Sequence, residues 1–153
     1  MTNNKRLLTE FKNFSENPAA LLSLDKARTV TMTTWFINME AAHETIYEGE
    51  KWTLQVNIRE GYPFTAPEVV FIDDKVPCNP HVYSNGHICM STLGGGWCAS
   101  TSIEAICNSI LSMLSSCKKK EWPMDNDAYV AMVGSQPPDY KRAFDGTYTD
   151  REC

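Results

Sequence analysis

Residues 52 to 59 alternate between apolar and polar side chains at every position, and this alternation constrains the fold more than any other feature of the chain. The apolar members are Trp52, Leu54, Val56 and Ile58, and the polar members are Thr53, Gln55, Asn57 and Arg59. Side chains of a β-strand point to its two faces in turn, so the pattern predicts a half-buried strand. Segments 29–39 and 69–72 are also strand-like. Their short connections predict an antiparallel meander.

Helical periodicity flanks these strands on both sides. Near the N-terminus Leu7, Leu8, Phe11 and Phe14 recur at helical spacing, and Asn17-Pro18 ends this helix. A second helix is predicted to begin at the capping-box pattern 101–104 and to end near the lysines at 118–120, whose charge suits a helix C-terminus. Its apolar stripe consists of Ile103, Ile106, Cys107, Ile110, Leu111 and Leu114. A short third helix is expected at 125–133.

The composition narrows the possible classes of protein. A chain of 153 residues with 42% hydrophobic content is of a size for one domain with a real core. The chain has 14 basic and 19 acidic residues, a formal net charge of −5. We therefore expect no broad nucleic-acid-binding surface, and protein partners fit better. No apolar run approaches the roughly 20 residues that span a bilayer. No signal-peptide core follows the first residues either, so we expect a protein of the cytoplasm and nucleus without membrane association.

Two irregular segments interrupt the pattern. In the first, 62–67, Pro63 and Pro67 forbid a regular ladder and predict a rigid excursion that displays Phe64, although a core position for this aromatic ring is the alternative. The second segment, 73–100, lacks periodicity for roughly thirty residues, which is long for a compact domain. Such a loop is usually functional or ordered by local packing.

The six cysteines differ in their surroundings. We expect reduced thiols, since the sequence has no export signal. Cys107 lies on a predicted apolar helix face, Cys117 near the end of that helix and Cys153 at the last position, so structural roles suffice for these three. Cys89 instead follows the turn pair Asn85-Gly86 within the long irregular segment. That setting predicts a solvent-reachable thiol capable of chemistry.

Three chemistries could use Cys89. Metal binding would recruit Cys78, His81 and His87, but the spacing is not that of a familiar zinc site, and we expect no metal. A redox switch would need a resolving thiol, for which Cys98 is near in sequence. Nucleophilic catalysis, in which the thiolate accepts an acyl group and the loop supplies oxyanion donors, involves more of the chain.

Several motifs occur in the order typical of one enzyme family. Tyr47-Glu48-Gly49 is followed by the proline loop 62–67, by Ser84-Asn85-Gly86-His87-Ile88-Cys89-Met90, and by Trp97 eight residues after the cysteine. Together with the long helix from Ile103, this order resembles the ubiquitin-conjugating enzymes over most of the chain. The resemblance implies an α+β ubiquitin-conjugating fold: an N-terminal helix, a four-stranded antiparallel meander, a long active-site loop, a central helix and a short C-terminal helical or irregular region.

The resemblance also implies an activity and partners. Cys89 would accept ubiquitin as a thioester from the ubiquitin-activating enzyme and pass it to an amine. No bound cofactor is implied, since ATP is used by the activating enzyme. The N-terminal helix would contact the activating enzyme through Lys5 and Arg6. RING or U-box ubiquitin ligases would meet Phe64, Trp97, Cys98, Ala99 and Ser100.

The active-site region departs from the family pattern in an informative way. Most members carry His-Pro-Asn before the active site, and the asparagine supports the oxyanion or orders the loop. Here the three positions read Asn79-Pro80-His81, so His81 replaces that asparagine. A neutral histidine can donate one hydrogen bond, and oxyanion support by His81 or a loop role for Asn79 both fit. His87 is also atypical. Each histidine would either accept a proton or order the loop.

These departures resemble the W-type branch of the family, which attaches single ubiquitin molecules to the α-amino groups of flexible substrate N-termini. An α-amine has a reference pKa of about 7.7 to 8.0, against about 10.4 for lysine, so it needs less help to become a nucleophile. By family resemblance Asp125 or Asn126 would lie near the incoming amine. The alternative for either residue is an N-cap of the helix that follows.

The sequence also predicts domain limits and leaves alternative functions open. We expect a catalytic core over 1–134 and a C-terminal extension over 135–153 that lacks a core-forming period. Transfer to lysine side chains is the alternative within the enzyme class. A non-catalytic module that binds ubiquitin or a ligase is the alternative outside it, although such relatives normally lack the cysteine. Both a monomer and a homodimer are compatible with the sequence.

Overall fold

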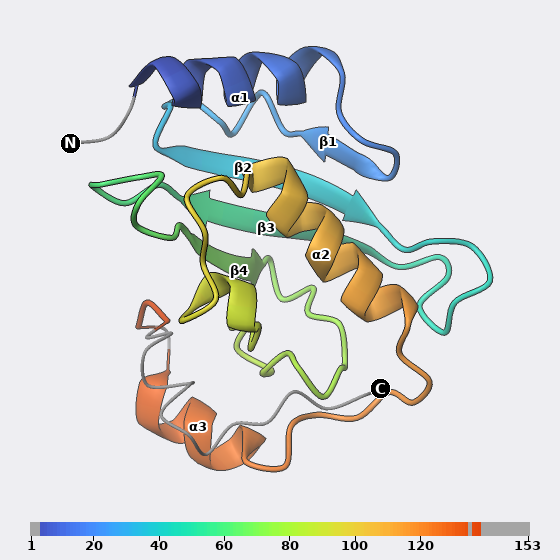
Figure 1. Ribbon diagram of the computed structural model, residues 1–153. Coiled ribbons are helices and arrows are strands. Elements are labelled where there is room, and N and C mark those ends of the chain that lie inside the picture. Colours follow the sequence, from blue (N-terminus) through green and yellow to red (C-terminus); the bar gives the residue numbers. More distant parts are fainter. Residues whose placement is uncertain (1–3, 135, 139–153) are drawn as a thin grey trace.

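The fold packs helices against one four-stranded sheet. The computed structural model describes residues 4–134 and 136–138, so most of the expected extension 135–153 lies outside the described residues. The elements are α1 (Asn4–Glu16), β1 (Leu22–Leu24), β2 (Thr34–Glu40), β3 (Lys51–Asn57), β4 (Glu68–Ile72), the 3₁₀ helix η1 (Ser91–Leu93), α2 (Ile103–Ser115) and α3 (Asn126–Val133). The strands pair antiparallel in the order β1-β2-β3-β4. The predicted α+β class and meander are therefore confirmed (Figure 1).

The alternating segment forms the central strand β3. Trp52, Leu54 and Val56 are at most 3% exposed. Leu54 lies opposite Ile37 of β2 and Phe71 of β4, so three strands contribute to one apolar layer. Helix α2 crosses this face of the sheet (Figure 1). Its buried side chains are Ile103, Ile106, Cys107, Ile110 and Leu114.

Strand β2 begins later than the composition of segment 29–39 predicts. Residues 26–28 form a turn, and the Thr29 hydroxyl accepts a hydrogen bond from the Phe36 backbone N–H at 2.9 Å. The Arg28 guanidinium also forms an ion pair with Asp73 and lies over the Phe36 ring. These contacts hold the connection from β1 in an irregular form, so local β-propensity is overridden before Thr34.

Both ends of α2 differ from the sequence prediction. The N-cap is Ser102, whose hydroxyl accepts a hydrogen bond from the Ala105 N–H at 3.0 Å, and not Thr101. The helix ends at Ser115, before the lysines at 118–120. The Ser115 and Ser116 hydroxyls donate to backbone carbonyls of the last turns, and such bonds compete with helix continuation.

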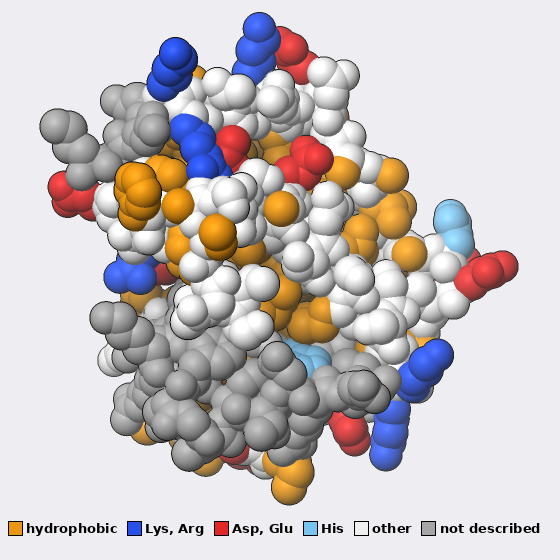
Figure 2. All heavy atoms as spheres, viewed as in Figure 1, with side chains coloured by type: hydrophobic (Ala, Val, Ile, Leu, Met, Phe, Trp, Pro, Cys, Tyr) orange, Lys and Arg blue, Asp and Glu red, His pale blue; other side chains and the backbone are white. Residues whose placement is uncertain are grey.

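The two ends of the molecule carry different elements. Helix α1 lies beside β1 and β2, whereas the loop after β4 and helix α3 lie at the opposite end (Figure 1). On the face seen in Figure 2, Lys and Arg side chains alternate with Asp and Glu, and the described atoms form no continuous basic surface. Within residues 4–134 and 136–138, no helix has the length and apolar character needed to cross a membrane.

Gly86 lets the long loop approach the edge of β4. Its φ is +95°, and the Phe71 N–H donates to the Gly86 carbonyl at 2.9 Å. A Cβ at position 86 would lie 2.1 Å from the Phe71 carbonyl oxygen. Both the backbone angle and the close approach therefore require glycine.

We expect Gly86→Ala to lower the free energy of unfolding by about 3 kcal/mol, because it adds a backbone clash to an unfavourable φ. Chemical denaturation of the full chain measures this. Gly95→Ala is the matched control, since a Cβ there meets nothing within 4 Å, and it should change stability by less than about 0.5 kcal/mol. Equal effects of the two substitutions would contradict the close approach.

Candidate active site

The loop that carries Cys89 is held by short-range backbone pairing. His87 forms an isolated antiparallel bridge with Val70 at the edge of β4. The Tyr83 N–H donates to the His87 carbonyl at 2.9 Å, and the Cys89 N–H donates to the His81 carbonyl at 2.8 Å. The segment that lacks periodicity is thus ordered by a tight fold of its own backbone against β4.

Cys89 is only 4% exposed, so the expectation of a solvent-reachable thiol is wrong. Ile88 is buried beside it, and Val82 and Ile88 form a further bridge within the loop. The Asn85-Gly86 pair does form a turn, but this turn folds back and brings the cysteine into the packed part of the loop. Turn residues in the sequence therefore indicated irregular backbone correctly and exposure incorrectly.

Asn79 orders the loop ahead of the cysteine. Its side chain is fully buried; the amide oxygen accepts the His81 N–H at 2.8 Å, and the amide nitrogen donates to the Tyr47 hydroxyl at 3.2 Å. The Tyr47 hydroxyl in turn donates to the Cys78 carbonyl. His81 itself is 6% exposed, and its backbone contacts both Asn79 and Cys89.

Tyr83 brings a carboxylate close to the thiol. Its hydroxyl lies 3.1 Å from both carboxylate oxygens of Asp125 and also interacts with Cys89. Burial raises the pKa of Tyr83 well above its ordinary value, and the charges of Cys89 and Asp125 raise this pKa further. Tyr83 therefore stays protonated and acts as a hydrogen-bond donor at neutral pH.

Asp125 and Asn126, the two residues expected near the amine, have different surroundings. Asp125 stands at the N-cap position of α3 but makes no side-chain capping bond, so the alternative role as an N-cap does not apply to it. The Asn126 amide is engaged with Ser84: its oxygen accepts the Ser84 N–H at 2.9 Å and its nitrogen donates to the Ser84 hydroxyl at 3.1 Å. Asn126 thus attaches α3 to the loop.

His87 points to α3 and is 5% exposed. Its Nδ1 lies 2.8 Å from the Tyr129 hydroxyl, and its ring meets the Tyr129 ring edge-on at 5.7 Å. Burial lowers the pKa of His87, while a hydrogen bond to the Gln136 backbone partly opposes this effect. The neutral imidazole is therefore the favoured form at this position.

The other cysteines fall into distinct environments. No disulfide joins the five described cysteines, and Cys153 lies outside the described residues. Cys107 is fully buried, which raises its pKa to about 12. Cys98 is exposed, and the Ser100 hydroxyl at 3.1 Å lowers its pKa. Within the part of the chain that the structure describes, no three His, Cys, Asp or Glu side chains group as a metal site requires.

The surface expected to meet ligases is present as one patch. Phe64 is 82% exposed, so the core alternative for this ring is wrong. The Trp97 indole N–H donates to the Pro63 carbonyl at 2.7 Å, which joins the proline loop to the segment 97–100. A groove of about 550 Å³ lies between them. Its lining includes Arg59, Phe64, Glu68, Leu93, Trp97, Pro137 and Pro138.

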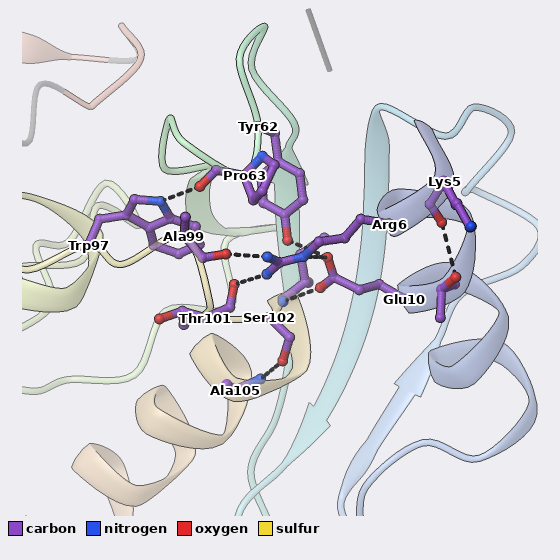
Figure 3. A network of polar contacts seen from close by, with 12 residues as sticks. Lys5, Arg6, Glu10, Tyr62, Pro63, Trp97, Ala99, Thr101, Ser102 and Ala105 are labelled. Carbon is purple, nitrogen blue, oxygen red and sulfur yellow. Dashed lines mark hydrogen bonds and ion pairs between the residues drawn. The ribbon is translucent and has the colours of Figure 1, made fainter. Parts of the chain in front are cut away.

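Arg6, expected to contact the activating enzyme, is directed into the molecule. Its guanidinium donates to the Ala99 carbonyl and, at 2.7 Å, to the Thr101 carbonyl (Figure 3). The Arg6 side chain is 26% exposed, whereas Lys5 is an exposed residue. Of this expected pair, Lys5 is the one presented to solvent, and Arg6 fixes the segment that leads into α2.

Glu10, which the sequence did not single out, receives hydrogen bonds from three elements. One carboxylate oxygen accepts from Arg6 at 3.2 Å and from the Tyr62 hydroxyl at 2.6 Å (Figure 3). The other accepts the Ile103 N–H at 2.8 Å. Burial and the Glu10 carboxylate raise the pKa of Tyr62 well above its ordinary value. Glu10 thereby satisfies a backbone N–H that the first turn of α2 leaves unpaired.

Sequence reasoning missed three further residues of the site. Tyr83 and Tyr129 stack at 3.8 Å with nearly parallel rings, and Ser84 binds Asn126. A signal for Tyr83 was present, because it lies in the same short segment as Cys89. The signal for Tyr129 was weak, since its contact with the loop depends on how α3 returns in space.

Comparison with known proteins identifies similar chains over most of the length. Residues 6–147 match the family model described as ubiquitin-conjugating enzyme. The probable ubiquitin-conjugating enzyme E2 W-A of Danio rerio is 46% identical over 135 residues, which cover 87% of this chain and 89% of that protein. The ubiquitin-conjugating enzyme E2 W of Caenorhabditis elegans is 40% identical over 134 residues, which cover 87% and 88%. The crystal structure of ubiquitin-conjugating enzyme E2 UbcA1 from Agrocybe aegerita gives a TM-score of 0.82 at 39% identity and covers 90% of this chain and all of that one.

The Arg6 contacts predict a difference in stability between two neighbouring basic residues. Arg6→Ala removes charged hydrogen bonds to the Ala99 and Thr101 carbonyls, and we expect the free energy of unfolding to fall by about 2 kcal/mol. Lys5→Ala is the control and should change it by less than about 0.5 kcal/mol, because Lys5 is exposed. Denaturant titration measures both. An Arg6→Ala protein as stable as the Lys5→Ala protein would show that these bonds contribute nothing.

The Cys98–Ser100 contact predicts a pH dependence. The thiolate is the reactive form, so a lowered pKa lets Cys98 react with iodoacetamide at a lower pH than an ordinary thiol. Ser100→Ala should move the midpoint of this pH–rate profile upward. Peptide mass spectrometry follows the label, with buried Cys107 as the internal reference that stays unlabelled in the folded protein. An unchanged midpoint in Ser100→Ala would exclude the hydroxyl as the cause.

Proposed function

This chain belongs to the ubiquitin-conjugating enzyme family, and from that premise we propose that it carries ubiquitin on Cys89 and transfers it, as a single ubiquitin, to the α-amino group of substrate N-termini. Members of this family are transferases that act through a cysteine thioester. The observation that carries the assignment to Cys89 is its contact with the Tyr83 hydroxyl, which also donates to the Asp125 carboxylate.

The reaction proceeds in two acyl transfers. In the first, the Cys89 thiolate attacks the C-terminal carbonyl carbon of ubiquitin on the activating enzyme; a new C–S bond forms and the thiolate of the activating enzyme leaves. In the second, a substrate amine attacks the same carbon, a C–N bond forms and the Cys89 thiolate leaves. The amine loses one proton to a nearby base. ATP is used by the activating enzyme alone, and this chain needs no cofactor.

The surroundings of the thiol support an α-amine as the acceptor. The Asp125 carboxylate, which contacts the same Tyr83 hydroxyl as Cys89, can orient an ammonium group or take the proton of an attacking amine. An α-amine requires little more, because roughly a tenth of such groups are unprotonated at pH 7, against less than roughly a thousandth of lysine side chains. A carboxylate is a weak base, and it therefore suits an α-amine acceptor better than a lysine side chain.

Two exposed regions, the start of α1 and the proline loop, support the proposed partner contacts. The exposed Lys5 fits a contact with the activating enzyme. The exposed Phe64 ring and the adjoining segment with Trp97, Cys98 and Ser100 fit RING or U-box ligases, because a large exposed aromatic beside a groove is typical of a docking site.

The test is a charging and discharge assay. Incubation with ubiquitin, activating enzyme and ATP should give an adduct that thiols cleave, and Cys89→Ser should give a thiol-resistant ester. The charged protein is then offered a lysine-free peptide with a free N-terminus, the same peptide acetylated, and free lysine. We expect discharge by the free N-terminus alone, read by mass spectrometry of the linkage.

Two results would overturn separate parts of the proposal. Absence of any adduct in the wild-type protein would remove the thioester role of Cys89. Discharge by free lysine, or equal discharge by the free and acetylated peptides, would remove the α-amine preference and leave lysine-directed conjugation as the function.

A further inference from the structure

Helix α3 lacks the apolar face that usually holds a helix to its domain. Asn126 is the one residue of α3 that is buried. The helix nevertheless sets the position of Asp125, which immediately precedes it, and it presents Tyr129 to the active-site loop. Because packing of an apolar stripe is the ordinary source of helix attachment, other contacts must fix α3 next to Cys89.

Those contacts come from residues 84–87 of the loop. Ser84 binds Asn126 at the first turn of α3. At the other end, the Asn85 amide donates to the Gly134 carbonyl at 2.9 Å, and His87 bonds to the Gln136 backbone. The His87 ring also contacts the Tyr129 hydroxyl in the middle of α3. The loop is therefore hydrogen-bonded to α3 at the beginning and at the end of the helix.

Among these residues, His87 has the backbone that is most directly attached to the sheet. Its backbone pairs with Val70 of β4, and its own N–H donates to the Asn85 side chain at 3.1 Å. The imidazole is nearly fully buried, so its hydrogen bond to Tyr129 is shielded from competing water. Through this single side chain the sheet edge is connected to the middle of α3.

Tyr129 is linked to the Cys89 thiol through Tyr83. Its ring stacks on that of Tyr83 at 3.8 Å, and the Tyr83 hydroxyl lies between Asp125 and Cys89. A displacement of Tyr129 would therefore change the place of both the hydroxyl and the carboxylate. Displacements of about 1 Å in such groups can cost a hundredfold in rate.

We propose that His87 is a positioning residue for the transfer step, which holds Tyr129 and thereby sets Tyr83 and Asp125 beside the Cys89 thioester. This inference rests on the proposed transfer from Cys89. His87 does not touch the reacting atoms in this role; it acts through Tyr129. Loading of ubiquitin onto Cys89 does not require Asp125 as a proton acceptor, so loading and transfer should respond differently to loss of the contact.

The test compares loading with single-turnover discharge in the full-length protein. His87→Ala should load within about twofold of wild type, while its discharge rate at saturating acceptor falls about tenfold with little change in the acceptor concentration at half-maximal rate. His87→Asn, whose amide can take the place of Nδ1 toward Tyr129, should recover most of the rate. The acceptor is whichever of the peptide and free lysine discharges the wild-type protein.

Tyr129→Phe supplies the matched control, because it removes the hydroxyl and keeps the ring stacked on Tyr83. It should slow discharge, and adding His87→Ala should then cost little more, as expected for two residues that act through one contact. Asn85→Ala, which leaves the His87–Tyr129 bond in place, should have a smaller effect. Circular dichroism and unfolding midpoints confirm that each variant is folded at the assay temperature.

The outcomes separate this inference from the proposed function. A wild-type protein that never loads ubiquitin overturns both. A wild-type protein that loads and discharges, beside a His87→Ala variant that discharges at the same rate, overturns the positioning role alone. The same follows if loading and discharge fall together, or if the effects of His87→Ala and Tyr129→Phe simply add.

Discussion

The edge of β4 is the constraint on which the site depends. The Phe71 N–H bonds to the Gly86 carbonyl, and His87 bridges to Val70, so the loop that carries Cys89 is attached to the sheet a few residues ahead of the thiol. The attachment is possible because Gly86 has no side chain to separate the two backbones. Once these residues are fixed, the Tyr83–His87 and His81–Cys89 backbone bonds close the loop on itself. A loop without periodicity thereby acquires the rigidity that a catalytic group needs.

A second constraint, at the other end of the sheet, comes from one carboxylate. Glu10 accepts hydrogen bonds from α1, from the Tyr62 side of the proline loop and from the first turn of α2. Its side chain is only 13% exposed, so these bonds replace water at a charged group. The surfaces proposed for the activating enzyme and for ligases both adjoin this carboxylate. Substitutions in α1 can therefore shift residues 97–100, the segment proposed to meet ligases, because Arg6 holds the Ala99 carbonyl.

The sequence predicts the structure correctly where a local pattern is compatible with only one kind of element. The alternation at 52–59, the stripe of α2 and the order of motifs around Cys89 sufficed for the fold and the family. It failed where neighbours distant in sequence decide the outcome. Thr101 matches the capping pattern, yet its carbonyl is taken by Arg6 and the cap moves to Ser102. The exposure of Cys89 and its contact with Tyr83 and Asp125 depend on the return of α3, for which the sequence has no apolar periodicity to place it.

The exchange of asparagine and histidine ahead of the active site has a structural consequence. Asn79 uses both ends of its amide inside the loop, toward the His81 N–H and the Tyr47 hydroxyl, and it is fully buried. The asparagine here thus orders the loop from two residues earlier than in the usual family pattern. His81 then stands where the usual asparagine would be, and its backbone carbonyl holds the Cys89 N–H. Since this N–H is already bonded to the His81 carbonyl, it is not free to donate to an oxyanion, and the exchange therefore orders the backbone on both sides of the thiol.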